Sequence, residues 1–193
     1  MYRQRQLDRL ERRTEAYLAK AEKLKKFILS DDCSEEAEDI REWLEKFCIG
    51  VGLDICCGYF PVADDAIGVD SDTSLVGIDW HLRGDELTPV RGNELDYIVT
   101  NYFDVFPNPI AALQEWHRAV REGGCLAFTC ANADEYKGHS GALANPRRTM
   151  TYTEQPIRHL LERTGWGDIV VVARNKNLLL SAYKRKSLPS PSR

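Results

Sequence analysis

Seven short apolar runs follow Gly50 and constrain the fold more than any other feature of the sequence. Glycine, aspartate and proline separate them, which is typical of strands joined by turns. The run Leu95–Thr100 contains three consecutive apolar residues, so both faces of that strand are apolar and belong in a covered, mostly parallel sheet. The predicted strands are Val51–Cys56, Ala66–Val69, Leu75–Trp80, Leu95–Thr100, Cys125–Cys130, Ile169–Ala173 and Leu178–Tyr183.

Helical patterns lie before and between these runs. Pro109–Arg121 begins with proline, carries apolar residues at helical spacing and ends before a glycine pair. Thr153–Arg163 has the same periodicity, with its threonine as the predicted cap. Two further helices are predicted before Gly50, through Leu7–Ile28 and through Glu35–Phe47.

The last two apolar runs are separated only by Arg174–Asn177. So short a link allows an antiparallel hairpin and excludes a crossover helix. The sequence therefore predicts an α/β fold: a doubly wound, mostly parallel, seven-stranded sheet with an antiparallel terminal strand and an N-terminal helical extension.

Composition bounds the class of protein. A chain of 193 residues with 43% hydrophobic residues is long enough for one domain with its own core, and it is not intrinsically disordered. The net charge of −4 argues against a dedicated nucleic-acid binder. No apolar run approaches the roughly 18 residues of a membrane span, and the charged N-terminus does not resemble a signal peptide. We therefore expect a cytoplasmic protein without a membrane partner.

Charge is distributed unevenly along the chain. Residues 1–29 carry nine basic and four acidic side chains, whereas residues 30–46 carry two basic and eight acidic ones. We interpret residues 1–49 as a helical extension packed on the body, 50–186 as the ligand-binding domain and 187–193 as a disordered tail. The basic segment could instead contact nucleic acid or a membrane surface. Its helices could also join two copies of the chain.

The six cysteines lack the spacing of a zinc site, and most lie in or beside apolar runs. We therefore expect reduced thiols and no metal.

The segment from Gly52 to Asp70 carries the chemistry. An apolar strand contains Asp54, a turn of small residues with Gly58 follows, and the next strand ends in Asp70. In an open α/β sheet, ligands bind at the carboxyl ends of such strands. An acid that closes the second strand can accept hydrogen bonds from both ribose hydroxyls. This arrangement predicts a nucleoside site.

The same segment argues against a dinucleotide. The fingerprint Gly-x-Gly-x-x-Gly is absent, and the stretch Tyr59–Asp65 is too short and proline-containing to form a helix that would hold a pyrophosphate. Asp64 and Asp65 would also repel one. A nucleoside with a positive centre fits better, and S-adenosylmethionine is a molecule of that kind.

At this point the sequence resembles the class I S-adenosylmethionine-dependent methyltransferase family, with a Rossmann-like, methyltransferase type 11-like domain over roughly residues 50–185. Leu53–Gly58 is similar to the family's first motif, although Cys56 and Phe60 replace two of its glycines. Leu95–Val99 is similar to its fourth strand, and Pro107–Gly124 to its helix and glycine pair. The resemblance implies methyl transfer, with S-adenosylhomocysteine as product and no metal.

The resemblance also implies the cofactor contacts. Asp70 would hold the ribose, Asp85 the adenine amino group (in competition with Asp79), and Asn101 would face the methyl or amino acid group. Asp54 and the turn Cys56–Tyr59 would cradle the methionine part. The predicted cofactor-binding set is Asp54, Cys56, Gly58, Tyr59, Asp70, Ser71, Asp85 and Asn101.

No catalytic residue is assigned, because transfer from a sulfonium needs a general base only when the acceptor must lose a proton. Candidates beside the cofactor are Asn101, Tyr102 and Asp104, and also His139 in the loop of residues 132–148. The methyl acceptor is unidentified. Two alternatives stay open: a non-catalytic binding module that docks a partner through its N-terminal helices, and a nucleic-acid methyltransferase.

Overall fold

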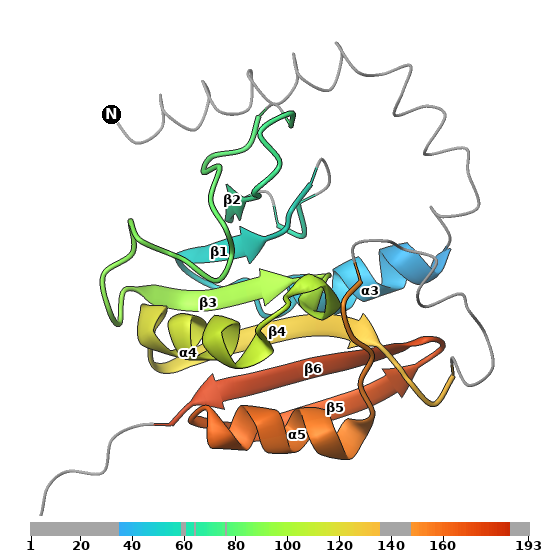
Figure 1. Cartoon of the computed structure of the whole chain (residues 1–193). Helices are drawn as coiled ribbons and strands as arrows, with labels where there is room; N and C mark the ends of the chain where they lie inside the picture. Colours follow the sequence, from blue (N-terminus) through green and yellow to red (C-terminus); the bar gives the residue numbers. More distant parts are fainter. Residues whose placement is uncertain (1–34, 59–60, 64, 76, 136–147, 186–193) are drawn as a thin grey trace, which may run out of the picture.

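The computed structural model describes residues 35–58, 61–63, 65–75, 77–135 and 148–185. These residues form one six-stranded sheet with the order β2-β1-β3-β4-β6-β5 (Figure 1). The strands β1, β2, β3 and β4 pair in parallel, whereas β6 runs antiparallel to both of its neighbours. The strands are β1 (Gly52–Ile55), β2 (Ile67–Val69), β3 (Leu95–Thr100), β4 (Val120–Ala131), β5 (Trp166–Arg174) and β6 (Asn177–Lys184).

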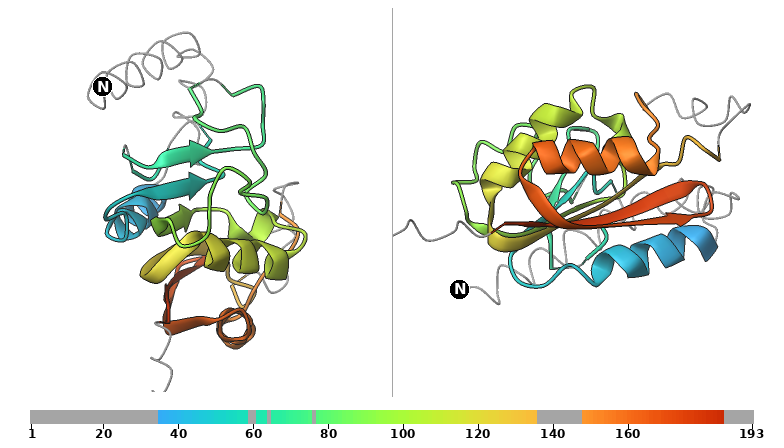
Figure 2. Two further views of the ribbon diagram at one scale, coloured as in Figure 1. Left: turned by 90° about the vertical axis from the view of Figure 1, so that its left-hand side faces the viewer. Right: turned by 90° about the horizontal axis from the view of Figure 1, so that it is seen from below.

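Helices cover both faces of the sheet, as a doubly wound arrangement requires (Figure 2). The helices α4 (Pro109–Ala119) and α5 (Glu154–Arg163) lie on one face, and α3 (Glu35–Glu45) lies on the other. A short 3-10 helix, η1 (Phe103–Val105), follows β3. The helix α4 begins where Asn108 accepts a hydrogen bond from the backbone N–H of Ala111 at 3.2 Å.

The antiparallel hairpin at the end of the chain is confirmed. Strands β5 and β6 pair from Arg174↔Asn177 to Trp166↔Lys184. The last strand does not close the sheet at its edge, however, because β6 lies between β4 and β5. The predicted helix Pro109–Arg121 is slightly too long: α4 ends at Ala119, and β4 begins at Val120.

The predicted strand Leu75–Trp80 is wrong. A turn precedes it, in which the N–H of Leu75 binds the carbonyl of Asp72, and Gly77 has a left-handed φ of +83° that a strand cannot continue through. What remains is one isolated bridge, Val69↔Trp80, beside β2. The described residues therefore contain six strands where seven are predicted.

Asp79 completes this edge of the sheet. Its Oδ2 accepts a hydrogen bond from the N–H of Gly68 at 2.7 Å, and the carbonyl of Gly68 accepts from the N–H of Trp80 at 3.1 Å. A side-chain carboxylate thus takes the place of a strand carbonyl at the outer edge of β2.

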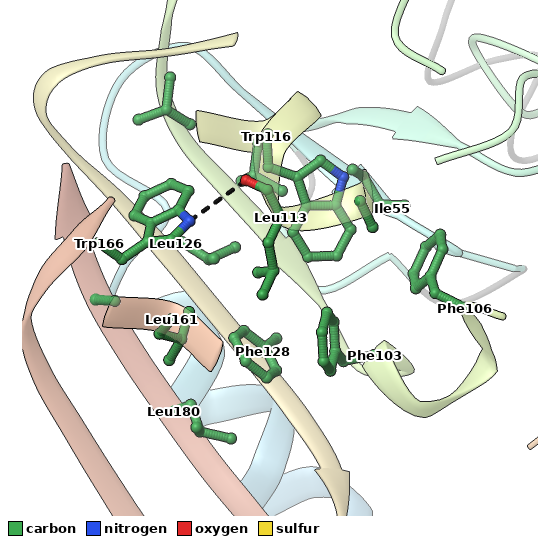
Figure 3. Packing of buried hydrophobic residues seen from close by; sticks show 14 of the residues in the cluster. Ile55, Phe103, Phe106, Leu113, Trp116, Leu126, Phe128, Leu161, Trp166 and Leu180 are labelled. Carbon is green, nitrogen blue, oxygen red and sulfur yellow. Dashed lines mark hydrogen bonds between the residues drawn. The ribbon is translucent and has the colours of Figure 1, made fainter. Parts of the chain in front are cut away.

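Two apolar clusters hold the three layers together. The larger lies between the sheet and the helices α4 and α5, where Phe103 contacts Trp116 and Phe128 (Figure 3). The indole of Trp166 donates a hydrogen bond to the carbonyl of Leu113 at 3.4 Å, which joins β5 to α4. The smaller cluster packs Ile40 and Leu44 of α3 against the opposite face.

The N-terminal extension is only partly visible. α3 packs on the sheet, but residues 1–34 and 187–193, which carry the rest of the predicted extension and the predicted tail, lie outside the described residues. Of the five cysteines that the structure describes, Cys57, Cys125 and Cys130 are buried. None of the described helices has the length and apolar character that a membrane crossing requires.

Candidate functional site

A hollow opens at the carboxyl ends of β1 and β2. It encloses about 210 Å³, which is less than the roughly 300–1,000 Å³ of typical ligand pockets and suits part of a cofactor. Four of the predicted cofactor residues share it, together with an apolar wall and one guanidinium. The lining residues are Cys56, Val69, Asp70, Ser71, Leu82, Arg83, Gly84, Asp85, Val105, Phe106 and Pro107.

The carboxylates of Asp54 and Asp70 hold the turn that follows β1. Asp54 is buried, and its Oδ2 accepts a hydrogen bond from the N–H of Val62 at 2.5 Å, across the loop to β2. Cys56 and Gly58 both adopt left-handed backbone conformations, with φ of +59° and +54°. The turn therefore doubles back toward Asp70. Asp54 fixes the loop and does not line the described hollow.

Asp70 is fixed by two backbone amides. Its Oδ2 accepts from the N–H of Gly58 at 3.1 Å, and its Oδ1 accepts from the N–H of Asp72 at 2.9 Å. The side chain is nearly buried but reaches the hollow. Because each carboxylate oxygen can accept a second hydrogen bond, Asp70 is preorganised to accept from two neighbouring hydroxyls.

Asp85 lies in the same hollow and forms a bidentate ion pair. Arg83 Nε and Nη2 donate to its Oδ1 and Oδ2 at 3.0 and 2.8 Å. These hydrogen bonds hold the pKa of the Asp85 carboxyl below its usual range, against the opposing effect of partial burial. Asp85 is therefore ionised and oriented, and each oxygen retains a lone pair for a ligand donor.

Three of the predicted residues that the structure describes, Asp54, Gly58 and Asn101, do not line this hollow. Asn101 follows β3, and Thr129 Oγ1 contacts its carbonyl oxygen and its Oδ1 at 2.9 and 2.5 Å. It is absent from the lining of the hollow. Tyr59 lies outside the described residues, so its predicted contact stays a prediction.

Comparisons with known proteins bear on the fold. No protein-family model and no curated protein sequence matches the chain. A methyltransferase dependent on S-adenosylmethionine from Thermotoga maritima is 14% identical with a TM-score of 0.67, over 89% of this chain and 99% of that one. A methyltransferase in complex with the Trm112 activator of Haloferax volcanii is 12% identical with a TM-score of 0.65, over 89% and 98%.

A third structure, phosphoethanolamine N-methyltransferase 2 of Haemonchus contortus in complex with S-adenosyl-L-methionine, is 13% identical with a TM-score of 0.61, over 77% of this chain and 53% of that one. The fold is that of the class I S-adenosylmethionine-dependent methyltransferases. The TM-scores establish the methyltransferase fold. Because the identities are low, the activity of this protein must be argued from the site.

Sequence reasoning missed part of the hollow in this methyltransferase fold. Arg83, Phe106 and Pro107 all line it. Arg83 carries a signal that could have been used, since it stands two residues before the predicted adenine acid. Phe106 comes from the segment after β3, and no local pattern predicts that this segment reaches the end of β2.

Among the catalytic candidates that follow β3, Asp104 is not available as a general base. It is 2% exposed; its Oδ2 accepts from the N–H of Ala131 at 3.1 Å and pairs with Arg148 Nε at 3.0 Å. Burial raises the pKa of this carboxyl. The carboxylate instead anchors the chain that returns at Arg148. Tyr102 is 40% exposed, and His139 lies outside the described residues.

The described residues contain no group of three or more His, Cys, Asp or Glu that could hold a metal ion.

Proposed function

We propose that this protein is a methyltransferase that binds S-adenosylmethionine in the hollow at the ends of β1 and β2. The observation that carries the proposal is that Asp70 and Asp85, each already oriented by other groups, line the same hollow. Asp70 would accept from the ribose hydroxyls and Asp85 from the amino group of the base. The left-handed turn at Cys56–Gly58, with Tyr59 after it, would lie against the methionine part.

The charge of the site supports this ligand over a nucleotide. Two carboxylates face the hollow, and the single guanidinium there, that of Arg83, is already paired with Asp85. Phosphate oxygens would be repelled, because like charges in a partly desolvated site are costly. A nucleoside joined to a sulfonium and a zwitterionic amino acid suits these charges.

The protein's share of the chemistry would be binding and alignment. S-adenosylmethionine supplies, when bound, a methyl group that its sulfonium has already activated. The carboxylates would fix the nucleoside end, while Val69, Leu82 and Phe106 exclude water from its base. Holding donor and acceptor in line accounts for most of the rate gain in a transfer that needs little side-chain chemistry.

Calorimetric titration of the full chain with S-adenosylmethionine tests this proposal, with S-adenosylhomocysteine as a second ligand. We expect saturable binding of both at one site per chain. ATP and NAD are the matched controls, since they share the adenosine and add phosphates; we expect them to bind far more weakly. Binding of NAD in preference to S-adenosylmethionine, or no heat with either sulfur ligand, would contradict the proposal.

A second role, docking of a partner protein, is supported by one comparison. One methyltransferase similar to this chain was solved in complex with the Trm112 methyltransferase activator. For this protein, docking of a partner and pairing of two copies would use the N-terminal extension, residues 1–49, and contact with nucleic acid would use its basic segment and the basic tail; residues 1–34 and 186–193 lie outside the described residues. Size-exclusion chromatography with light scattering, on the full chain and on a chain that lacks residues 1–29, would separate a dimer from a monomer.

A further inference from the structure

Asp85 sits on a segment without regular secondary structure of its own. Among the described residues between β2 and β3, from Ser71 to Glu94, there is no helix and no strand beyond the isolated bridge at Trp80. A side chain that recognises a ligand must nevertheless be held within a fraction of an ångström. Arg83 orients the carboxylate of Asp85 from within the segment, so contacts outside the segment must fix the backbone that carries both residues.

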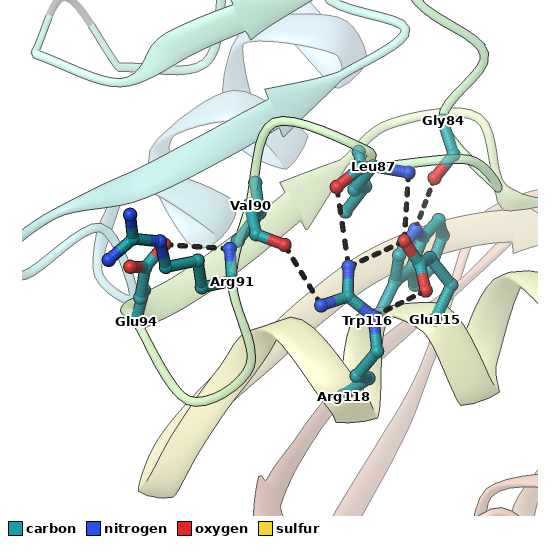
Figure 4. Close-up of polar contacts among 8 residues, drawn as sticks. All are labelled: Gly84, Leu87, Val90, Arg91, Glu94, Glu115, Trp116 and Arg118. Atoms are coloured by element: carbon teal, nitrogen blue, oxygen red, sulfur yellow. Dashed lines mark hydrogen bonds and ion pairs between the residues drawn. The ribbon is translucent and has the colours of Figure 1, made fainter.

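The helix α4 supplies these contacts. The indole N–H of Trp116 donates to the carbonyl of Gly84, the residue before Asp85, at 2.7 Å in a buried position (Figure 4). Glu115 Oε1 accepts from the N–H of Leu87 at 2.9 Å. One side chain thus binds the backbone just before Asp85, and another binds it two residues after.

Arg118 extends the same set of contacts. Its guanidinium donates to the carbonyls of Val90 and Leu87 at 2.9 and 3.3 Å, and it also pairs with Glu115 Oε1 at 2.7 Å (Figure 4). Glu115 therefore satisfies the N–H of Leu87, and Arg118 is a second donor to its carbonyl, which also accepts from the N–H of Val90 at 2.9 Å.

Close packing at Gly84 also restrains the backbone just before Asp85. A Cβ atom at Gly84 would overlap Ile55 at the end of β1 and the ring of Phe106. Gly84 therefore packs directly against Ile55 and Phe106. With its carbonyl bound by Trp116 and no room for a side chain at Gly84, the backbone before Asp85 has little freedom.

We propose that Glu115, Trp116 and Arg118 of α4 are positioning residues that hold Asp85 for recognition of the amino group of the cofactor's base. This inference rests on the proposed function, because it assigns the source of precision at the base end of that same site. None of the three lines the hollow, so each acts through the backbone on either side of Asp85.

The test measures selectivity for the base as well as affinity. In S-inosylhomocysteine a carbonyl replaces the 6-amino group of S-adenosylhomocysteine, which Asp85 would accept from, and the neighbouring N1 carries a hydrogen. Hydrogen bonds to charged groups imply that the wild-type chain prefers the adenosyl compound by about tenfold or more. Asp85→Asn should remove most of this preference, because an amide can turn to meet either group.

The positioning residues should change the same ratio. Trp116→Phe keeps the ring and removes the donor to Gly84, and Arg118→Met removes the donors to Leu87 and Val90 from an exposed position. We expect the preference to fall at least about threefold in each. Gln114→Met, at an exposed position of α4, is a matched control that should leave it unchanged.

The outcomes separate the inference from the proposed function. An unchanged ratio of the two affinities in Trp116→Phe and Arg118→Met, even where both ligands bind more weakly, would overturn the inference. The methyltransferase proposal would then still stand. Failure of the wild-type chain to bind either ligand would overturn both. If Trp116→Phe does not fold, Arg118→Met decides the question, since its side chain is 42% exposed and is not part of the core.

Discussion

The backbone N–H of Gly58 donates a hydrogen bond to the carboxylate of Asp70 at 3.1 Å. This bond joins the turn after β1 to the acid that ends β2, so the two predicted halves of the nucleoside site form one unit. The turn needs no helix behind it to hold this position, because Asp70 fixes one end and Asp54 fixes the loop through Val62. The truncated connection between β1 and β2 is thereby compatible with an ordered site.

Asp70→Asn should weaken binding of S-adenosylmethionine by at least about tenfold, because a hydrogen bond to a charged group contributes about 1.5–3 kcal/mol. Calorimetric titration measures the loss. Asp134→Asn, an acid outside the lining of the hollow, is the control. Wild-type affinity in Asp70→Asn would refute the ribose assignment.

Gly58→Ala should affect binding more than folding. At a φ of +54° an alanine costs about 1–2 kcal/mol of stability. Apart from its chain neighbours, no atom of the described residues lies within 4 Å of a Cβ placed there, so the methyl group would project into open space beside the turn. If the cofactor lies in that space, the loss of binding free energy exceeds the loss in free energy of unfolding. A loss of stability with unchanged affinity would place the ligand elsewhere.

Asp79→Ala should destabilise the protein and spare ligand binding. The substitution leaves the buried N–H of Gly68 without its acceptor, at a cost of about 1–3 kcal/mol in the free energy of unfolding. Because Asp79 does not line the hollow, affinity for S-adenosylmethionine should change little. Urea denaturation and calorimetry measure the two effects. A large loss of affinity at equal folding would revive Asp79 as the base contact.

In Glu115→Gln, the free energy of unfolding should depend less on pH in the acidic range. Hydrogen bonds from Arg118 hold the pKa of Glu115 below its ordinary value of 4.5. Below that value the unfolded chain takes up the proton first, so the wild type loses stability as the pH falls toward the lowered folded pKa. The variant lacks this contribution: it should be less stable at neutral pH and lose less on acidification.

Urea denaturation over a pH series measures this difference. Glu86→Gln is the control, because the carboxylate of Glu86 is exposed and forms only a surface ion pair, 3.6 Å from Arg83 Nε. If the wild type and Glu115→Gln show parallel curves on acidification, Glu115 has no such role.

The sequence predicts those parts of the fold that depend on local patterns. The strand Leu95–Thr100 has the predicted bounds because its apolar run is bordered by polar turns, and the four-residue link dictates the hairpin of β5 and β6. The error at Leu75–Trp80 has a local cause in Gly77, whose left-handed conformation interrupts an otherwise strand-like run.

The candidate site is less predictable, because partners distant in the sequence assemble it. The acids at positions 70 and 85 can be named from their places after strands, yet nothing near Asp85 reveals that Trp116 binds the residue before it. Asp104 looks available in sequence and is buried in the structure, since its partner Arg148 arrives from 44 residues away. Which acid faces a ligand and which supports the backbone is decided by such distant contacts.

The place of β6 between β4 and β5 has a consequence for how the chain reaches its native state. The gap between β4 and β5 is filled by β6, which follows both of them in the chain, so the sheet is incomplete until Asn177–Lys184 has been synthesised. Until Asn177–Lys184 inserts, β4 and β5 each expose an unpaired edge that could associate with other chains. Chains in which β6 has not yet inserted are therefore the form most prone to aggregation.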